Sequence, residues 1–302
     1  MTGAAWARFM ELRGWKVIEG AGSFWQQFHQ GCYISFPLHI PIDPAAAELD
    51  GLLRSKHALC LRYASVRPSG LPGGIYVVRD KNFGLASINS KARGKLRRGL
   101  ERCEIKPVDA DLLAREGLVL NRETMNRQRR FEREFGEPKR WKRFVEAVRR
   151  SSNISVLGAF ADGRLNSYAV LHREDDWIYL LYQMSLTAGL QNAANTALHY
   201  EVCRLIAGVG VEAICSGPIP LAPGRLHSFK TQMGMTVLPQ TFAFRFHPAI
   251  APAAEAGAVQ TVVSSLHRIW PQNPRLEIVS NVLRGSRLAN NLARRADEVV
   301  PC

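Results

Sequence analysis

The fold is decided by residues 154–172, which read ISVLGAFADGRLNSYAVLH. Apolar and β-branched residues fill both halves of this stretch, and the pair Asp162-Gly163 interrupts them. Asp-Gly between two apolar runs is a strong hairpin signal, because both residues tolerate the positive φ of a type I′ turn. The stretch therefore predicts two antiparallel strands, residues 154–160 and 165–172, joined by a tight turn.

The chain after this hairpin predicts a crossover unit. A third strand is expected at residues 177–182, a helix at 192–208 and a fourth strand at 211–215. A Gly/Pro-rich loop, a short helix and a last strand at 241–246 follow. The order strand-strand-strand-helix-strand-helix-strand indicates an α/β module in which an antiparallel meander leads into a crossover.

The first third of the chain predicts a second unit that is richer in strands. Short apolar runs separated by Pro, Gly and Asp-Lys-Asn turns predict strands at residues 15–19, 32–36, 58–64, 74–79 and 83–88. Asp43-Pro44 supplies an N-cap and an N1 proline for one helix that runs to about Lys56. A small mixed sheet with one helix follows from this spacing.

Helices dominate the segment between these two units. Asn89-Ser90 can cap a helix that ends near Arg102, and residues 103–108 then form a strand. Two further helices are expected at residues 110–130 and 138–150. Together with the helix that ends near Arg102, these two helices carry most of the excess positive charge of the chain.

Composition narrows the class of protein. The 302 residues are 46% apolar and 22% charged, as in ordinary packed domains. No run approaches the roughly 20 apolar residues of a membrane-spanning helix, and residues 1–8 lack the apolar core of a secretory signal. We therefore expect a soluble cytoplasmic protein without a membrane span.

Several kinds of chemistry lack their sequence signals. The six cysteines form no Cys-x-x-Cys pair and no His-Glu-x-x-His string occurs, so neither a metal site nor a disulfide framework is expected. Paired carboxylates suited to glycoside hydrolysis and a Gly-x-Ser-x-Gly elbow are also absent. The net charge of +14 favours polyanionic partners. Metal-free chemistry without a nucleophilic side chain is what remains.

Four sequence elements together resemble a known superfamily. They are a basic helix followed by a strand, a Gly…Asp-Gly hairpin, a helix start beginning Asn-Thr-Ala-Leu, and a Phe-Lys…Gly element, at residues 93–108, 158–170, 195–201 and 228–234. This set resembles the GNAT-like acyltransferases, and among them the Fem-type aminoacyltransferases and the CelD-like acetyltransferases. The resemblance implies transfer of an acyl or aminoacyl group from an activated carrier to an amine acceptor, with no permanently bound cofactor.

The resemblance also implies an architecture. It is an α/β (α+β) fold of tandem GNAT-like modules, with mixed central sheets flanked by helices and a helical C-terminal tail. We assign residues 1–135 to a first, degenerate module, residues 136–247 to a second module and residues 248–302 to the helical extension.

The expected donors are acyl-CoA, acyl carrier protein and aminoacyl-tRNA, all of them anionic. GNATs that use acetyl-CoA hold its pyrophosphate with a glycine-rich loop at a helix N-terminus. The equivalent residues 186–195 read LTAGLQNAAN and keep one glycine of that pattern. This departure weakens the expectation of standard CoA binding and favours Fem-type or carrier-protein-dependent donors.

Acyl transfer to an amine passes through a tetrahedral oxyanion, and the amine must lose a proton. Lys230 is the candidate oxyanion partner, because the resemblance places the pair Phe229-Lys230 beside the acyl donor. Candidates for the proton acceptor are His199, His227, Tyr182 and Glu201, and no spacing decides among them. The residues expected to bind donor or substrate are Phe229, Asn195 and His227.

A cationic stripe is expected on the helix that Asn89-Ser90 caps. It comprises Lys91, Lys95, Arg98 and Arg102, at positions i, i+4, i+7 and i+11. The stripe could bind phosphates of a nucleotide-linked substrate or tRNA, or could be a solvated helix face. The charge also leaves open a non-catalytic, basic nucleic-acid-binding protein, although no RNP strand, zinc finger or helix-turn-helix is present. If the protein is an acyltransferase, we expect a cleft between the modules with Lys230 on its wall.

Overall fold

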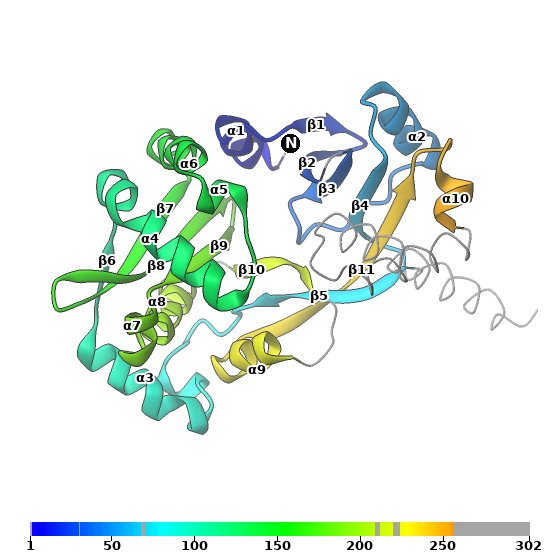
Figure 1. The fold of residues 1–302 in the computed structure, drawn as a ribbon. Coiled ribbons are helices and arrows are strands. Elements are labelled where there is room, and N and C mark those ends of the chain that lie inside the picture. The colour runs from blue at the N-terminus through cyan, green and yellow to red at the C-terminus, as the bar shows by residue number, and fades with distance from the viewer. Residues whose placement is uncertain (1, 30, 68–69, 209–211, 220–223, 256–302) are drawn as a thin grey trace, which may run out of the picture.

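The computed structural model describes residues 2–29, 31–67, 70–208, 212–219 and 224–255. Within them, one mixed sheet contains eleven strands (Figure 1). In spatial order these are β1 (Val17–Gly20), β2 (Ser23–His29), β3 (Cys32–Phe36), β4 (Cys60–Ser65), β11 (Thr236–Phe246), β5 (Leu71–Val77), β10 (Glu212–Ile219), β9 (Trp177–Ser185), β8 (Arg164–Glu174), β7 (Ile154–Ala161) and β6 (Glu104–Pro107). The neighbours β3–β4 and β9–β10 are parallel, and the other neighbours are antiparallel.

The β7–β8 hairpin forms as its sequence predicts. Asp162 and Gly163 adopt φ values of 50° and 72° at the turn, which fits a type I′ geometry. Alternate side chains of β8 then point to opposite faces of the sheet. Tyr168 belongs to a hydrophobic cluster on one face, and Ala169 belongs to a cluster on the other. Both faces of this sheet region are therefore buried.

Helices cover these two faces. On the Tyr168 face lie α4 (Ala110–Gln128), α5 (Arg133–Gly136) and α6 (Pro138–Arg150), and on the Ala169 face lie α8 (Ala194–Gly208) and, outside it, α3 (Ser90–Arg102). Helix α3 begins as predicted, since the Asn89 side chain accepts a hydrogen bond from the Lys91 backbone N–H. None of the helices in the described ranges combines the length and the apolar character that crossing a membrane requires.

Two segments, one near the start of the sequence and one near the end of the described residues, connect the two halves of the sheet. Helix α1 (Ala4–Leu12) packs on β1, β2, β8 and α6. Its N-terminus is fixed by Glu174 of β8, whose carboxylate accepts hydrogen bonds from the backbone N–H groups of Gly3 and Trp6 at 2.8 and 3.1 Å. Strand β11 lies between β4 and β5 and pairs with both. Strands from before and after the predicted module boundary at residue 135 therefore belong to the same hydrogen-bonded sheet. The division into modules stays a prediction.

Several expectations for the first third were wrong. Residues 83–88 do not form a strand but contain a short 3-10 helix, η1 (Leu85–Ser87), which Ser87 closes by donating its hydroxyl to Asp80. Asp43 does not cap a helix, because its carboxylate pairs with Arg67 and α2 (Ala46–Ser55) begins later. Helix α1 and strand β2 were not expected. Of the predicted helical extension, α10 (Ala251–Glu255) is present, and residues 256–302 lie outside the described residues.

Candidate active site

Strands β9 and β10 diverge in the middle of the sheet. They pair from Trp177 with Glu212 to Leu180 with Cys215, at the start of both strands. Beyond that point β10 pairs with β5, whereas β9 continues to Ser185. Open α/β sheets bind their ligands in the crevice outside the carboxyl ends of parallel strands, where neighbouring strands part. The divergence therefore marks a place for a ligand.

A bulge in β9 coincides with the divergence. Val170 of β8 faces Tyr182, and the next residue, Leu171, faces Leu180, so Leu181 is an extra residue in β9. A bulge bends its strand and redirects the side chains that follow, and such bulges are common beside active sites. The change of register turns this part of β9 into the wall of a cavity.

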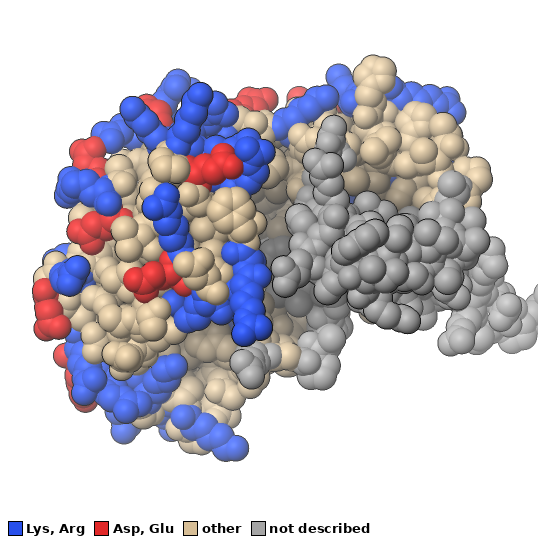
Figure 2. All heavy atoms as spheres, in the orientation of Figure 1, with Lys and Arg blue, Asp and Glu red and all other residues tan. Residues whose placement is uncertain are grey.

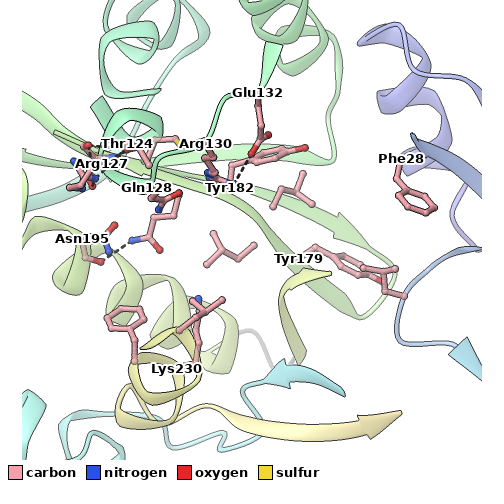
Figure 3. Close-up of a pocket in the computed structure, with 18 of the residues that line it drawn as sticks. Phe28, Thr124, Arg127, Gln128, Arg130, Glu132, Tyr179, Tyr182, Asn195 and Lys230 are labelled. Carbon is pink, nitrogen blue, oxygen red and sulfur yellow. Dashed lines mark hydrogen bonds and ion pairs between the residues drawn. The ribbon is translucent and has the colours of Figure 1, made fainter. Parts of the chain in front are cut away.

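This cavity has a volume of about 690 Å³ (Figure 3). Its walls come from β9, the C-terminal end of α4, the N-terminal strands β2 and β3, and helix α9 (Arg225–Gln232). A volume of this size is ordinary for a small-molecule site. The cavity brings together four of the residues singled out from the sequence, which are Tyr182, Asn195, Phe229 and Lys230.

Lys230 lies on the cavity wall and is only 4% exposed. Its ammonium nitrogen is 5.7 Å from the centre of the Phe229 ring. Helix α9 is held in place at its C-terminal end, where the backbone N–H of Asn89 donates to the Gln232 carbonyl. Gly234 follows with a φ of +79°, and a Cβ there would lie 2.7 Å from the Ser87 carbonyl oxygen. In the Phe-Lys…Gly element, Phe229 and Lys230 thus line the cavity, and Gly234 is required by the close packing against Ser87.

His199 lies behind this wall and is fully buried. The Gln183 side-chain N–H donates to the Asn195 carbonyl at 2.8 Å, so its Oε1 faces His199 Nδ1 at 3.2 Å. An amide oxygen can only accept, and Nδ1 therefore carries the proton. Burial, followed by the positive charge of Lys230, holds the pKa of His199 well below its usual value. His199 is a neutral imidazole, and its Nε2 has no hydrogen-bond partner among the described residues.

Tyr182 is fixed by a buried ion pair. Arg13 of α1 donates to the Tyr182 hydroxyl oxygen at 2.6 Å and to both carboxylate oxygens of Glu134. Burial raises the pKa of Tyr182, although Arg13 opposes the shift. At neutral pH the phenol keeps its proton, so Tyr182 can orient a substrate by hydrogen bonding but has no basic oxyanion to offer.

The other residues singled out from the sequence lie elsewhere. His227 Nδ1 is 3.1 Å from the Tyr76 hydroxyl and does not line the cavity. Glu201 pairs with Arg204 at 2.8 Å on the surface of α8. The cationic stripe is exposed on α3 and does not reach the cavity wall; lysines and arginines gather over that region of the surface (Figure 2).

Several residues that line the cavity were not among the predicted site residues. Arg127 at the end of α4 donates to the Ser185 hydroxyl at 2.9 Å, and Arg130 pairs with Glu132 at 2.6 Å. Gln183 connects the cavity with His199. The two arginines lie in a charged run of a kind that usually marks a solvated helix, so only the fold reveals their position. Within the described residues, no group of three or more His, Cys, Asp or Glu side chains is arranged to hold a metal ion.

Comparison with known proteins identifies the fold. No family model matches the chain, and no curated protein matches its sequence. The crystal structure of FemX aligns with 83% of this chain and 93% of its own, with a TM-score of 0.59 and 12% identity. The C-terminal domain of a putative lysylphosphatidylglycerol synthetase from Agrobacterium fabrum aligns with 85% of this chain and 91% of its own, with a TM-score of 0.53 and 14% identity.

A third structure agrees with these two. The L-PGS from Bacillus licheniformis aligns with 81% of this chain and 88% of its own, with a TM-score of 0.53 and 11% identity. At such identities the likeness concerns the fold alone. The chain has the GNAT-like, Fem-type fold, and the predicted fold class, with its mixed sheet flanked by helices, is confirmed.

Proposed function

We propose that the protein is an N-acyltransferase that moves an acyl or aminoacyl group from an activated carrier onto an amine. The observation that carries the proposal is the buried Lys230 on the wall of the cavity where β9 and β10 diverge. A charge in a partly dry cavity interacts far more strongly with a developing charge than one in water. The fold shared with FemX supports the same reading.

The reaction follows from what the cavity offers. The amine nitrogen attacks the carbonyl carbon of the carrier ester or thioester, so that a C–N bond forms and the carbonyl electron pair moves onto oxygen. The Lys230 ammonium stabilises this oxyanion. When the carbonyl re-forms, the C–O or C–S bond breaks, and the carrier leaves with the proton that the amine has lost.

We assign the proton to the departing carrier rather than to a side chain. Tyr182 keeps its own proton, and His199 is buried behind Gln183 and Phe229. His199 acts as a positioning residue in this proposal, because it fixes the Gln183 side chain. Because its imidazole is neutral, it places no second positive charge near Lys230. Asn195, whose carbonyl anchors Gln183, belongs to the same framework.

For the donor, we favour a macromolecular carrier, either aminoacyl-tRNA or acyl carrier protein, over acyl-CoA. The residues before α8 lack the glycine-rich pattern that holds the CoA pyrophosphate. The cationic stripe is exposed on α3 and separated from the cavity wall, which suits a carrier large enough to contact both.

A transfer assay tests the proposal. The wild-type protein and Lys230→Ala are offered aminoacyl-tRNA, acyl carrier protein and acyl-CoA donors with a panel of amines, and products are detected by mass spectrometry. We expect Lys230→Ala to lower kcat about a hundredfold, or about 3 kcal/mol, by analogy with the removal of one oxyanion-hole donor. Lys81→Ala, an exposed lysine away from the cavity, is the matched control and should keep the wild-type rate. Transfer by Lys230→Ala at the wild-type rate with every accepted donor would refute the role of Lys230.

A further inference from the structure

One end of the cavity is lined by aromatic and aliphatic side chains. We call this the aromatic end; it comprises Trp6, Phe28, Phe36, Leu38 and Tyr179. The rings of Trp6 and Phe36 stack at 4.7 Å, and those of Phe36 and Tyr179 lie 5.0 Å apart. The segments that supply these side chains are far apart in sequence, so the aromatic end exists only in the folded chain.

The polar atoms of the aromatic end already have protein partners. The Trp6 indole N–H donates to Gln26 Oε1 at 2.5 Å. The Tyr179 hydroxyl is 2.6 Å from His39 Nδ1, and burial lowers the pKa of His39 to about 4, so this imidazole is neutral. Apart from the amide of Gln26, which also lines the cavity, a ligand therefore meets hydrocarbon here, and apolar surface is what such a wall binds best.

The opposite end of the cavity is polar and positively charged. Figure 3 shows Arg127 and Asn195 on the far side of the cavity from Phe28 and Tyr179, with Lys230 between the two groups. We call this the cationic end. An anionic carrier fits it, and a carbonyl beside Lys230 then directs the remainder of the acyl group away from the carrier. That direction leads to the aromatic end.

The charges on the walls disfavour an acyl group with a positively charged side chain. The charged residues lining the cavity, among those the structure describes, are Arg127, Arg130, Glu132 and Lys230. Glu132 is the one carboxylate among them, and Arg130 already pairs with it at 2.6 Å. A lysyl group would place a further ammonium here without a carboxylate to receive it.

We propose that the aromatic end is a subsite for an apolar, uncharged side chain or alkyl chain of the transferred acyl group, and that an aminoacyl group with a cationic side chain, such as lysyl, is excluded. This rests on the proposed acyl transfer and names the class of its substrate. Each methylene that the subsite buries should tighten binding about fourfold. Selectivity then comes from both attraction for hydrocarbon and rejection of charge.

Binding of chain-matched probes tests the subsite without any transfer. Decanol, octanol and decylamine are titrated into the full-length protein by isothermal titration calorimetry. We expect decanol, which is two methylenes longer, to bind about sixteenfold more tightly than octanol. It should also bind at least about tenfold more tightly than decylamine, which carries the same chain with a positive charge. Equal binding of decanol and decylamine would overturn the proposal, and so would equal binding of decanol and octanol.

A charge placed in the subsite sharpens the test. Phe28→Glu should weaken decanol at least about tenfold and make decylamine the better ligand, because the new carboxylate receives the ammonium. Leu205→Glu adds the same charge at an exposed apolar position of α8 and should change neither affinity. Unchanged decanol binding by Phe28→Glu would refute the assignment. If this variant does not fold, the wild-type comparison still decides.

The subsite and the transfer reaction can fail separately. Selective decanol binding without transfer from any donor would retain the subsite and reject the proposed function. The transfer assay with acetyl, decanoyl and lysyl donors gives the converse result. Transfer of all three with equal kcat/KM would retain the function and overturn the subsite, whereas a preference for decanoyl over both supports the two together.

Discussion

Positive charge occurs in two different settings in this protein. Lys230 and Arg13 are buried, one on the cavity wall and the other beneath Tyr182, where its guanidinium contacts the Phe9 and Phe144 rings. The cationic stripe on α3 is exposed to water instead. Two unit charges 4 Å apart interact several times more strongly near or within a protein than in bulk water. The few buried cations therefore dominate stability and chemistry, while the many exposed ones act on distant partners.

The largest effect is expected at Arg13. Arg13→Ala leaves the Glu134 carboxylate buried without its partner, and breaking a buried pair in this way costs about 3–5 kcal/mol. Urea denaturation followed by circular dichroism measures the free energy of unfolding. Arg67→Ala, which breaks an exposed pair of similar length with Asp43, is the matched control and should cost less than about 1 kcal/mol. Equal costs for the two would contradict the comparison.

Lys230 should show that buried charge depends on position as well as sign. Lys230→Arg keeps the charge, but its planar guanidinium cannot place that charge at the same point as the ammonium. We expect kcat about tenfold below wild type, between the wild type and the alanine variant, with folding unchanged by circular dichroism. A rate equal to that of Lys230→Ala would mean that charge alone does not rescue the reaction.

Two histidines, the partly buried His39 and the fully buried His199, extend the comparison of buried and exposed charge, because burial keeps their imidazoles neutral. Burial lowers the pKa of His39 to about 4, despite the opposing charges of Asp175 and Glu174. Between about pH 4 and 6.5, His39 is protonated in the unfolded chain but not in the folded chain. The free energy of unfolding therefore falls as the pH falls through this window. His39→Gln should flatten that slope in urea titrations at a series of pH values, and an unaltered slope would assign it to His199 and other groups.

The smallest effect on stability is expected from the stripe. Replacing Lys91, Lys95, Arg98 and Arg102 together by Ala should change the free energy of unfolding by less than about 1 kcal/mol and leave kcat alone. The donor KM should rise and lose much of its dependence on salt, because phosphate contacts release counterions. An unchanged slope of log KM against log salt would place the anion contact elsewhere, with the arginines of the cationic end as the next candidates.

Local signals in the sequence were sufficient for the elements that local interactions build. The turn at Asp162-Gly163 and the cap at Asn89 act within a few residues, and both elements formed as predicted. Residues 83–88 have the composition of a strand, but Ser87 and Asp80 close a local turn instead. For such short apolar runs, hydrophobic pattern alone does not separate the alternatives.

The site was less predictable, because long-range pairing creates it. Lys230 and Asn195 could be named from their sequence surroundings, and both line the cavity. The divergence of β9 and β10, and the link from Gln183 to His199, depend on strand pairing and packing that no single segment encodes. The catalytic role of Lys230 and the binding role of Asn195 stay predictions until transfer is measured.

The position of β11 bears on how the chain acquires its structure during synthesis. This strand is among the last described segments to be made, yet it lies between β4 and β5 in the interior of the sheet. Until the ribosome has released Phe246, the facing edges of those two strands have no neighbour there, and such exposed edges favour misassembly. Non-local pairing of this kind also slows folding. We therefore expect the nascent protein to depend on chaperones between the synthesis of β5 and that of β11.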